Sequence, residues 1–262
     1  MSLLDRFRLD DKVAIVTGAS SGLGVAFAEG LAECGADVVV CARRAERLEQ
    51  TRERVEGLGR RCLAVPADVT SPEDCTRVVE QAMESFGHVD VLVNNAGLGT
   101  AVPATRETPE EFRRVIDINL NGSYWMAQAC GRVMQPGSSI VNIGSVLGST
   151  SGGLPQAAYS ASKAAIIGLA SKAAIIGLTR DLAQQWTGRK GIRVNALAPG
   201  FFPSEMTDEY PEGYLDRMIV RVPAGRPGDP AELTCAVVFL AADASSFITG
   251  VLLPVDGGML TT

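Results

Sequence analysis

A tyrosine and a lysine spaced four residues apart are the side chains in this sequence with the clearest chemical potential. Residues 158–163 read AYSASK and contain Tyr159 and Lys163. In a helix this spacing places both side chains on one face, with Cβ atoms roughly 5–6 Å apart. An ammonium group lowers the pKa of a neighbouring phenol from its usual value of about 10. The pair is therefore a candidate proton donor and acceptor near neutral pH, although the same spacing also occurs by chance on exposed helices.

A glycine-rich turn near the amino terminus offers a site for phosphate groups. Residues 13–17 read as an apolar strand and residues 25–32 as a helix, so the turn lies in a strand–turn–helix unit. Gly18 would allow the tight turn, Gly22 would let the backbone approach a pyrophosphate, and Gly24 would permit close helix–strand packing. A plain structural turn is the alternative; a P-loop does not fit, because no Gly-Lys-Ser/Thr follows. The turn residues that we expect to contact a dinucleotide are Gly18, Ser20, Ser21, Gly22, Leu23 and Gly24.

The end of the second predicted strand, residues 37–41, bears on which dinucleotide is bound. An acidic residue at this point would hold a free ribose hydroxyl, whereas an arginine accommodates a 2′-phosphate. The sequence has no carboxylate there, and Arg43 and Arg44 follow the strand closely. NADP is therefore the favoured cofactor, with NAD possible. The alternative for both arginines is a solvated helix start.

Two further strand ends complete the predicted cofactor site. The third strand runs into Asp68 and Val69, and Asp68 would either accept a hydrogen bond from the adenine amino group or cap the next helix at Ser71. The fourth strand, residues 89–93, runs into small residues that would let a ribose pass close to the backbone. The residues expected at the cofactor here are Asn95, Ala96 and Gly97.

The order and intervals of these motifs identify a family. They are Thr17-Gly18-x-x-x-Gly22-x-Gly24, Asn94-Asn95-Ala96-Gly97, Asn119, Ser145, Tyr159-x-x-x-Lys163 and Pro199-Gly200. The chain resembles the short-chain dehydrogenase/reductase family over nearly all of its 262 residues, and in particular members such as 3-oxoacyl-carrier-protein reductases and gluconate 5-dehydrogenases. The resemblance implies an α/β fold: one doubly wound Rossmann domain over residues 1–262, with a seven-stranded parallel sheet flanked by helices.

The resemblance also implies roles for four residues. Tyr159 would be the general acid in carbonyl reduction and the general base in alcohol oxidation, and Lys163 would lower its pKa and bind the nicotinamide ribose. Ser145 would orient the substrate oxygen. Asn119 would bend its helix and hold a water molecule that feeds a proton relay to Lys163. Taken singly, Ser145 could instead satisfy a strand end and Asn119 could cap a helix.

The residues after the sixth strand should complete the cofactor site. By the resemblance, Pro199 and Gly200 lie beside the nicotinamide, and Ser204 stands where the family usually has a threonine to meet the carboxamide. Phe202 is expected to contact the cofactor as well. Exchanging one hydroxyl for another keeps a donor and an acceptor, so we expect little effect from Ser204.

A tandem repeat departs from the family pattern. Residues 161–169 read ASKAAIIGL and residues 170–178 repeat them letter for letter. Nine helical residues span about 2.5 turns, so a continuous helix would turn everything beyond the repeat by about 180° and exchange the faces of Leu182 and Trp186. We expect the first copy to be unperturbed, because Lys172 has Gly168 rather than tyrosine four residues before it, and we expect the chain to accommodate the repeat after Leu169. A cofactor-binding protein inactivated by the repeat is one alternative function.

Three segments are expected to set substrate specificity: residues 98–100, 146–156 and the long segment 201–226, which would act as a lid. The acidic residues 205–212 and the scarcity of basic residues disfavour a carrier-bound acyl group. We therefore predict an NADP(H)-dependent carbonyl reductase that interconverts a small ketone or aldehyde and a secondary alcohol, with an NAD-linked sugar, sugar-acid or polyol dehydrogenase as the alternative. The substrate residues expected are Leu98, Val146, Leu147, Gln156, Phe201 and Met206.

Composition excludes several other classes. A net charge of −6 disfavours nucleic acid as a partner. The six cysteines lack Cys-x-x-Cys spacing and no cluster of metal ligands appears, so we expect a reduced, cytoplasmic chain without metal. We find no signal-type segment or membrane span. Residues 251–258 resemble the family's last strand and turn, which implies a homotetramer, with a dimer as the fallback.

Overall fold

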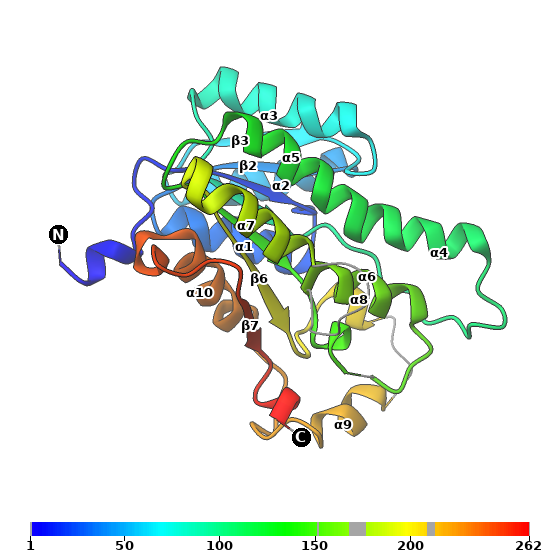
Figure 1. The fold of residues 1–262 in the computed structure, drawn as a ribbon. Helices are drawn as coiled ribbons and strands as arrows, with labels where there is room; N and C mark the ends of the chain where they lie inside the picture. Colours follow the sequence, from blue (N-terminus) through cyan, green and yellow to red (C-terminus); the bar gives the residue numbers. More distant parts are fainter. Residues whose placement is uncertain (1, 151, 168–176, 209–212, 262) are drawn as a thin grey trace.

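A seven-stranded sheet with every strand parallel to its neighbours organises the chain. The computed structural model describes residues 2–150, 152–167, 177–208 and 213–261. The strand order is β3-β2-β1-β4-β5-β6-β7, which confirms the predicted doubly wound α/β fold (Figure 1). The strands are β1 Val13–Thr17, β2 Asp37–Ala42, β3 Cys62–Pro66, β4 Val91–Asn94, β5 Ser139–Ile143, β6 Arg193–Pro199 and β7 Leu252–Val255.

Helices connect successive strands and cover both faces of the sheet. The chain also forms a π-helical turn at Asp117–Asn121, directly before α5 (Gly122–Val133). No helix in the described part of the chain is long and apolar enough to cross a lipid bilayer. The α-helices are α1 Gly22–Glu33, α2 Ala45–Gly57, α3 Pro72–Phe86, α4 Pro109–Ile116, α5 Gly122–Val133, α6 Ala157–Ile167, α7 Leu178–Lys190, α8 Glu205–Asp208, α9 Tyr214–Ile219 and α10 Pro230–Ala241.

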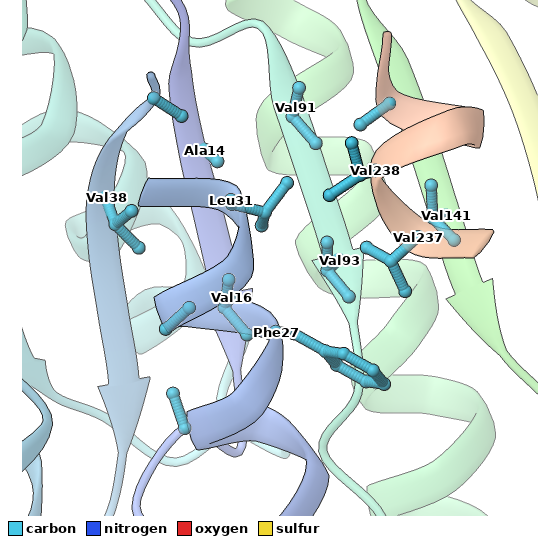
Figure 2. Packing of buried hydrophobic residues seen from close by; sticks show 14 of the residues in the cluster. Ala14, Val16, Phe27, Leu31, Val38, Val91, Val93, Val141, Val237 and Val238 are labelled. Atoms are coloured by element: carbon cyan, nitrogen blue, oxygen red, sulfur yellow. The ribbon is translucent and has the colours of Figure 1, made fainter. Parts of the chain in front are cut away.

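Alternation along the strands produces two apolar layers, because successive strand side chains point to opposite faces. On one face, Phe27 and Leu31 of α1 pack with Val16 of β1, Val93 of β4 and Val237 of α10 (Figure 2). The other face is covered by α3, α5 and α7. Strands buried on both faces are nearly continuous apolar runs, as parallel sheets require.

The carboxyl ends of all the strands lie on one edge. β1 and β4 are neighbours in the sheet, and the chain leaves β1 toward β2 and β3 but leaves β4 toward β5 and β6. The strand order therefore reverses between β1 and β4, and in open α/β sheets this reversal opens a crevice at the carboxyl edge.

The two copies of the repeat contribute to two separate helices. The first copy is helical as far as Ile167, the end of α6, and α7 begins at Leu178, the last residue of the second copy. Gly177 has extended backbone angles (φ −55°, ψ 145°), so α7 is not a continuation of α6. The predicted accommodation after Leu169 falls outside the described residues.

Because α7 does not continue α6, the face that α7 turns toward the sheet does not depend on the rotation of α6. Leu182 is buried beneath α7, and Trp186 packs on the same layer. A Cβ atom added at Gly131 of α5 would lie 2.8 Å from the Trp186 ring. The exchange of faces expected for a continuous helix therefore does not apply.

Candidate active site

A cleft of about 490 Å³ runs along the carboxyl edge of the sheet at the point where the strand order reverses. Every residue that we predicted to contact the cofactor lines it, from Gly18 in the glycine-rich turn to Ser204 after β6. Tyr159, Lys163 and Ser145 line the same cleft. The structure thus brings together side chains from segments far apart in the sequence.

Two of the glycines in the turn are required by close packing. A Cβ atom added at Gly24 would lie 2.4 Å from the carbonyl oxygen of Gly18, and one added at Gly18 would lie 2.8 Å from the Cα of Ala96. Gly22 differs, because its added Cβ atom would meet only Ser204, at 3.6 Å. Its positive φ of 54° and open surroundings leave the backbone at the start of α1 accessible to a ligand.

Polar contacts fasten the ends of β1 and β4 to each other at the floor of the cleft. The Thr17 hydroxyl accepts hydrogen bonds from the backbone N–H groups of Asn95 (3.0 Å) and Ala96 (2.9 Å). The Asn95 side-chain amide donates to the carbonyl oxygen of Thr17 at 3.0 Å. Asn95 therefore both lines the cleft and holds the glycine-rich turn through its side chain.

At the adenosine end of the predicted site, Arg44 is held by the glycine-rich turn. Its guanidinium group donates to the hydroxyls of Ser20 (3.1 Å) and Ser21 (2.6 Å). Arg44 also forms a 3.1 Å ion pair with Glu205 at the start of α8. Glu205 lines the cleft and was missed from the sequence, where the only signal was the run of acidic residues that begins with it.

Asp68 lines the cleft but does not cap α3. Its carboxylate accepts hydrogen bonds from the backbone N–H (3.0 Å) and hydroxyl (2.9 Å) of Thr70. The cap is Ser71, whose hydroxyl accepts from the backbone N–H of Asp74 at 3.1 Å. Of the two alternatives for Asp68, helix capping is therefore wrong.

Tyr159 and Lys163 are both buried at the base of the cleft, with 7% and 4% of their surfaces exposed. α6 presents both on one face, and the Lys163 amine lies 5.7 Å from the centre of the Tyr159 ring. The amine donates a 2.8 Å hydrogen bond to the carbonyl oxygen of Ile143, the last residue of β5. Burial disfavours the charged amine and lowers the pKa of Lys163 from 10.5 to about 8. The amine is therefore still mostly protonated at neutral pH.

Ser145 reaches the cleft from the end of β5. Its hydroxyl accepts a 3.1 Å hydrogen bond from the backbone N–H of Leu147, so it does satisfy local backbone. A hydroxyl also carries one donor hydrogen, which this bond leaves available. Structural and substrate-orienting roles are compatible in the same side chain.

Asn119 does not line the cleft but lies behind it, fully buried in the π-helical turn. Its side-chain oxygen accepts from the backbone N–H of Leu98 at 2.7 Å, and its amide donates to the carbonyl oxygen of Leu98 at 2.9 Å. The amide's second hydrogen goes to Ser162. With these bonds the side chain joins the segment after β4 to α6, and the predicted water relay remains a prediction.

The residues predicted to contact substrate divide into two groups. Leu98, Val146, Leu147 and Phe201 line the cleft near Tyr159 and give it apolar walls. Gln156 does not: it is 6% exposed and lies just ahead of α6, where its carbonyl oxygen accepts from the backbone N–H of Ser160. We therefore no longer place Gln156 at the substrate. The side chain of Met206 lies outside what the structure describes.

Comparison with known proteins agrees with this geometry. Residues 12–215 match the family described as short chain dehydrogenase. The 3-oxoacyl-[acyl-carrier-protein] reductase of Thermotoga maritima is 37% identical, with 97% of this chain and 99% of that protein covered. The galactitol 2-dehydrogenase (L-tagatose-forming) of Cereibacter sphaeroides is 40% identical, with 96% of each chain covered.

A solved structure shows the same fold with a cofactor present. The crystal structure of a gluconate 5-dehydrogenase from Burkholderia cenocepacia, in complex with NADP and tartrate, superimposes with a TM-score of 0.89 at 32% identity and covers 100% of both chains. Together with the cleft and the Tyr159–Lys163 pair, these matches show that the chain belongs to the short chain dehydrogenase family, as an NAD(P)-dependent oxidoreductase that acts on CH–OH groups.

Proposed function

We propose that this protein is an NADP(H)-dependent oxidoreductase that interconverts a ketone or aldehyde and a secondary alcohol, with Tyr159 as the general acid and base. The observation that carries the proposal is the buried Tyr159–Lys163 pair in the cleft at the carboxyl edge of the sheet. A cationic amine beside a phenol is the arrangement that makes a tyrosine proton transferable near neutral pH.

The residues of the cleft fit a phosphorylated dinucleotide. The open backbone at Gly22 and the start of α1 would receive the pyrophosphate. Arg43 and Arg44 stand where a 2′-phosphate would lie, and both line the cleft. The related gluconate 5-dehydrogenase was solved with NADP. When bound, the nicotinamide would supply or accept a hydride at its C4 atom.

Side chains of the protein would transfer the proton. In reduction the Tyr159 hydroxyl donates its proton to the substrate oxygen as the carbonyl carbon receives the hydride, and in oxidation the phenolate takes that proton back. Lys163, fixed by the carbonyl oxygen of Ile143, stabilises the phenolate. Ser145 donates a hydrogen bond that orients the substrate oxygen, and Asn119 positions α6 from behind.

The walls of the cleft favour a small, uncharged substrate. Leu98, Val146, Leu147 and Phe201 are apolar, and the acidic Glu205 stands further along the cleft. A free ketone or secondary alcohol suits these walls better than a carrier-bound acyl group. A sugar or polyol dehydrogenase is the second candidate, favoured by the galactitol 2-dehydrogenase relative.

We also propose a cytoplasmic homotetramer, with a dimer as the fallback. β7 is an edge strand of the sheet, and edge strands that stay uncovered invite pairing with another chain. Beside it, the Phe247 side chain is fully exposed and Val251 is 37% exposed. Covering these apolar groups with a second copy would remove them from water.

A panel of small ketones, secondary alcohols, polyols and sugar acids, assayed with both cofactors, tests the proposal. We expect turnover with NADP(H), and Tyr159→Phe should abolish it while leaving cofactor affinity nearly unchanged. Tyr124→Phe, on the exposed side of α5, is the matched control. Full activity of Tyr159→Phe would remove Tyr159 from the mechanism, and cofactor binding without turnover of any compound would favour the alternative that the repeat has inactivated the protein.

A further inference from the structure

Glu205 pairs with an arginine that a 2′-phosphate at the end of β2 would contact. Its carboxylate forms an ion pair with Arg44 at 3.1 Å and a second ion pair with Arg47 of α2. Arg44 lines the cleft, and a phosphate at the end of β2 would need its guanidinium group. The inference that follows rests on the proposed NADP(H) dependence.

The position of Glu205 is fixed from two sides. The loop before α8 crosses the glycine-rich turn, because an added Cβ atom at Gly22 would touch Ser204 at 3.6 Å. The backbone N–H of Ser204, the last residue of that loop, donates to the hydroxyl of Thr207 in α8 at 2.8 Å. Arg44, for its part, is anchored to Ser20 and Ser21 of the turn. The Glu205 side chain thus links the segment after β6 to α2 across the adenosine end of the cleft.

The three arginines that follow β2, Arg43, Arg44 and Arg47, differ in their ion pairs. Arg44 and Arg47 are engaged by Glu205, whereas Arg43, exposed and lining the cleft, has no ion pair among the residues that the structure describes. A 2′-phosphate would therefore meet Arg43, which has no such ion pair, and Arg44, which shares the single negative charge of Glu205 with Arg47. It also meets a carboxylate of its own sign, which costs binding free energy.

We propose that Glu205 is a specificity-determining residue, an internal carboxylate that competes with the 2′-phosphate of NADP(H) for Arg44 and so reduces the preference of the protein for NADP(H) over NAD(H). NAD(H) carries no phosphate there and leaves the ion pairs intact. Binding of NADP(H) would have to weaken the contact between Glu205 and Arg44.

Direct binding of NADPH and NADH to the Glu205→Gln variant tests this, measured by quenching of protein fluorescence and by calorimetry. The glutamine keeps the size of the side chain and removes its charge. Because a like-charge neighbour of a phosphate is removed, we expect NADPH affinity to rise by about fivefold or more while NADH affinity stays within twofold. Adenosine 2′,5′-bisphosphate should gain affinity in the same proportion, and adenosine 5′-monophosphate should not.

Glu49→Gln is the matched control, because Glu49 pairs with Arg52 on α2 and does not line the cleft. Arg44→Gln should weaken NADPH binding, and adding Glu205→Gln to it should restore less than the single Glu205→Gln gains. An NADPH-to-NADH affinity ratio in Glu205→Gln within twofold of the Glu49→Gln ratio, or lower than it, would overturn the inference. Failure of both cofactors to bind the unaltered protein would instead overturn the proposed function.

Discussion

The side-chain amide of Asn119 donates a 2.9 Å hydrogen bond to the hydroxyl of Ser162, the residue directly before Lys163. The Ser162 hydroxyl in turn donates to the carbonyl oxygen of Tyr159 at 2.7 Å. A buried chain of hydrogen bonds therefore connects the π-helical turn to the backbone of Tyr159. Asn119 and Ser162 act as positioning residues, since they fix α6 without facing the cleft.

Removing the Ser162 hydroxyl should break the hydrogen bonds that link Asn119 to Tyr159. Ser162→Ala leaves a buried amide hydrogen of Asn119 without an acceptor, which costs about 1–3 kcal/mol of the free energy of unfolding. We expect kcat to fall several-fold with little change in cofactor affinity, because only the placement of Tyr159 and Lys163 changes. Ser160→Ala in the same helix is the control. Unfolding in urea and steady-state kinetics measure both effects, and a Ser162→Ala variant indistinguishable from Ser160→Ala would contradict the role.

The buried amine of Lys163 should make stability depend on pH. Its pKa is about 8 in the folded protein and 10.5 when unfolded, so the unfolded state binds more protons between these values. Below pH 8 both states carry the charge, and its burial costs about 3 kcal/mol. As pH rises from 8 toward 10.5, the unfolded chain loses its proton as well and this cost disappears.

Lys163→Met removes that cost at every pH. The free energy of unfolding of the variant minus that of the parent should therefore be most positive at pH 7 and should decrease by about 3 kcal/mol between pH 8 and 10.5. Urea unfolding at pH 7.0, 8.5 and 9.5 measures the trend. A difference that does not change with pH would show that the amine is not desolvated in the folded protein.

The turn should tolerate no side chain at Gly24. An alanine there would place its Cβ atom 2.4 Å from the carbonyl oxygen of Gly18, which forces the turn open. We expect Gly24→Ala to lower the free energy of unfolding by about 1–3 kcal/mol and to weaken dinucleotide binding at least tenfold. Gly188→Ala in α7 meets nothing within 4 Å and should instead stabilise the protein by about 0.5–1 kcal/mol. Equal effects of the two substitutions would refute the packing argument.

Deleting residues 170–178 tests whether the repeat affects the site. Lys163, in the first copy, donates to Ile143, and Thr179, directly after the second copy, accepts a 2.9 Å hydrogen bond from the buried Asn142 amide. Because neither contact involves a residue of the deleted segment, we expect cofactor affinity and kcat to stay within a few-fold and the state of assembly to change. Kinetics and light scattering measure these outcomes. Activity that rises from near zero on deletion would show that the repeat had disabled the enzyme.

The family resemblance of the motifs implied the parallel sheet and most residues of the site. The strand–turn–helix pattern and the glycine spacing placed Gly18, Gly22 and Gly24 at a predicted phosphate site, and the structure has them at the carboxyl edge of the sheet. Long-range contacts were beyond reach: Glu205 meets Arg44 across 161 positions, which no local pattern records. The burial of Gln156 was missed for the same reason, since exposure depends on which segments pack over a residue.

Asn142 and Ile143 are consecutive residues of β5, and they bond to α7 at Thr179 and to α6 at Lys163. Two neighbouring positions of a single strand therefore hold both helices, and the sheet itself sets where Lys163 and Thr179 lie relative to each other.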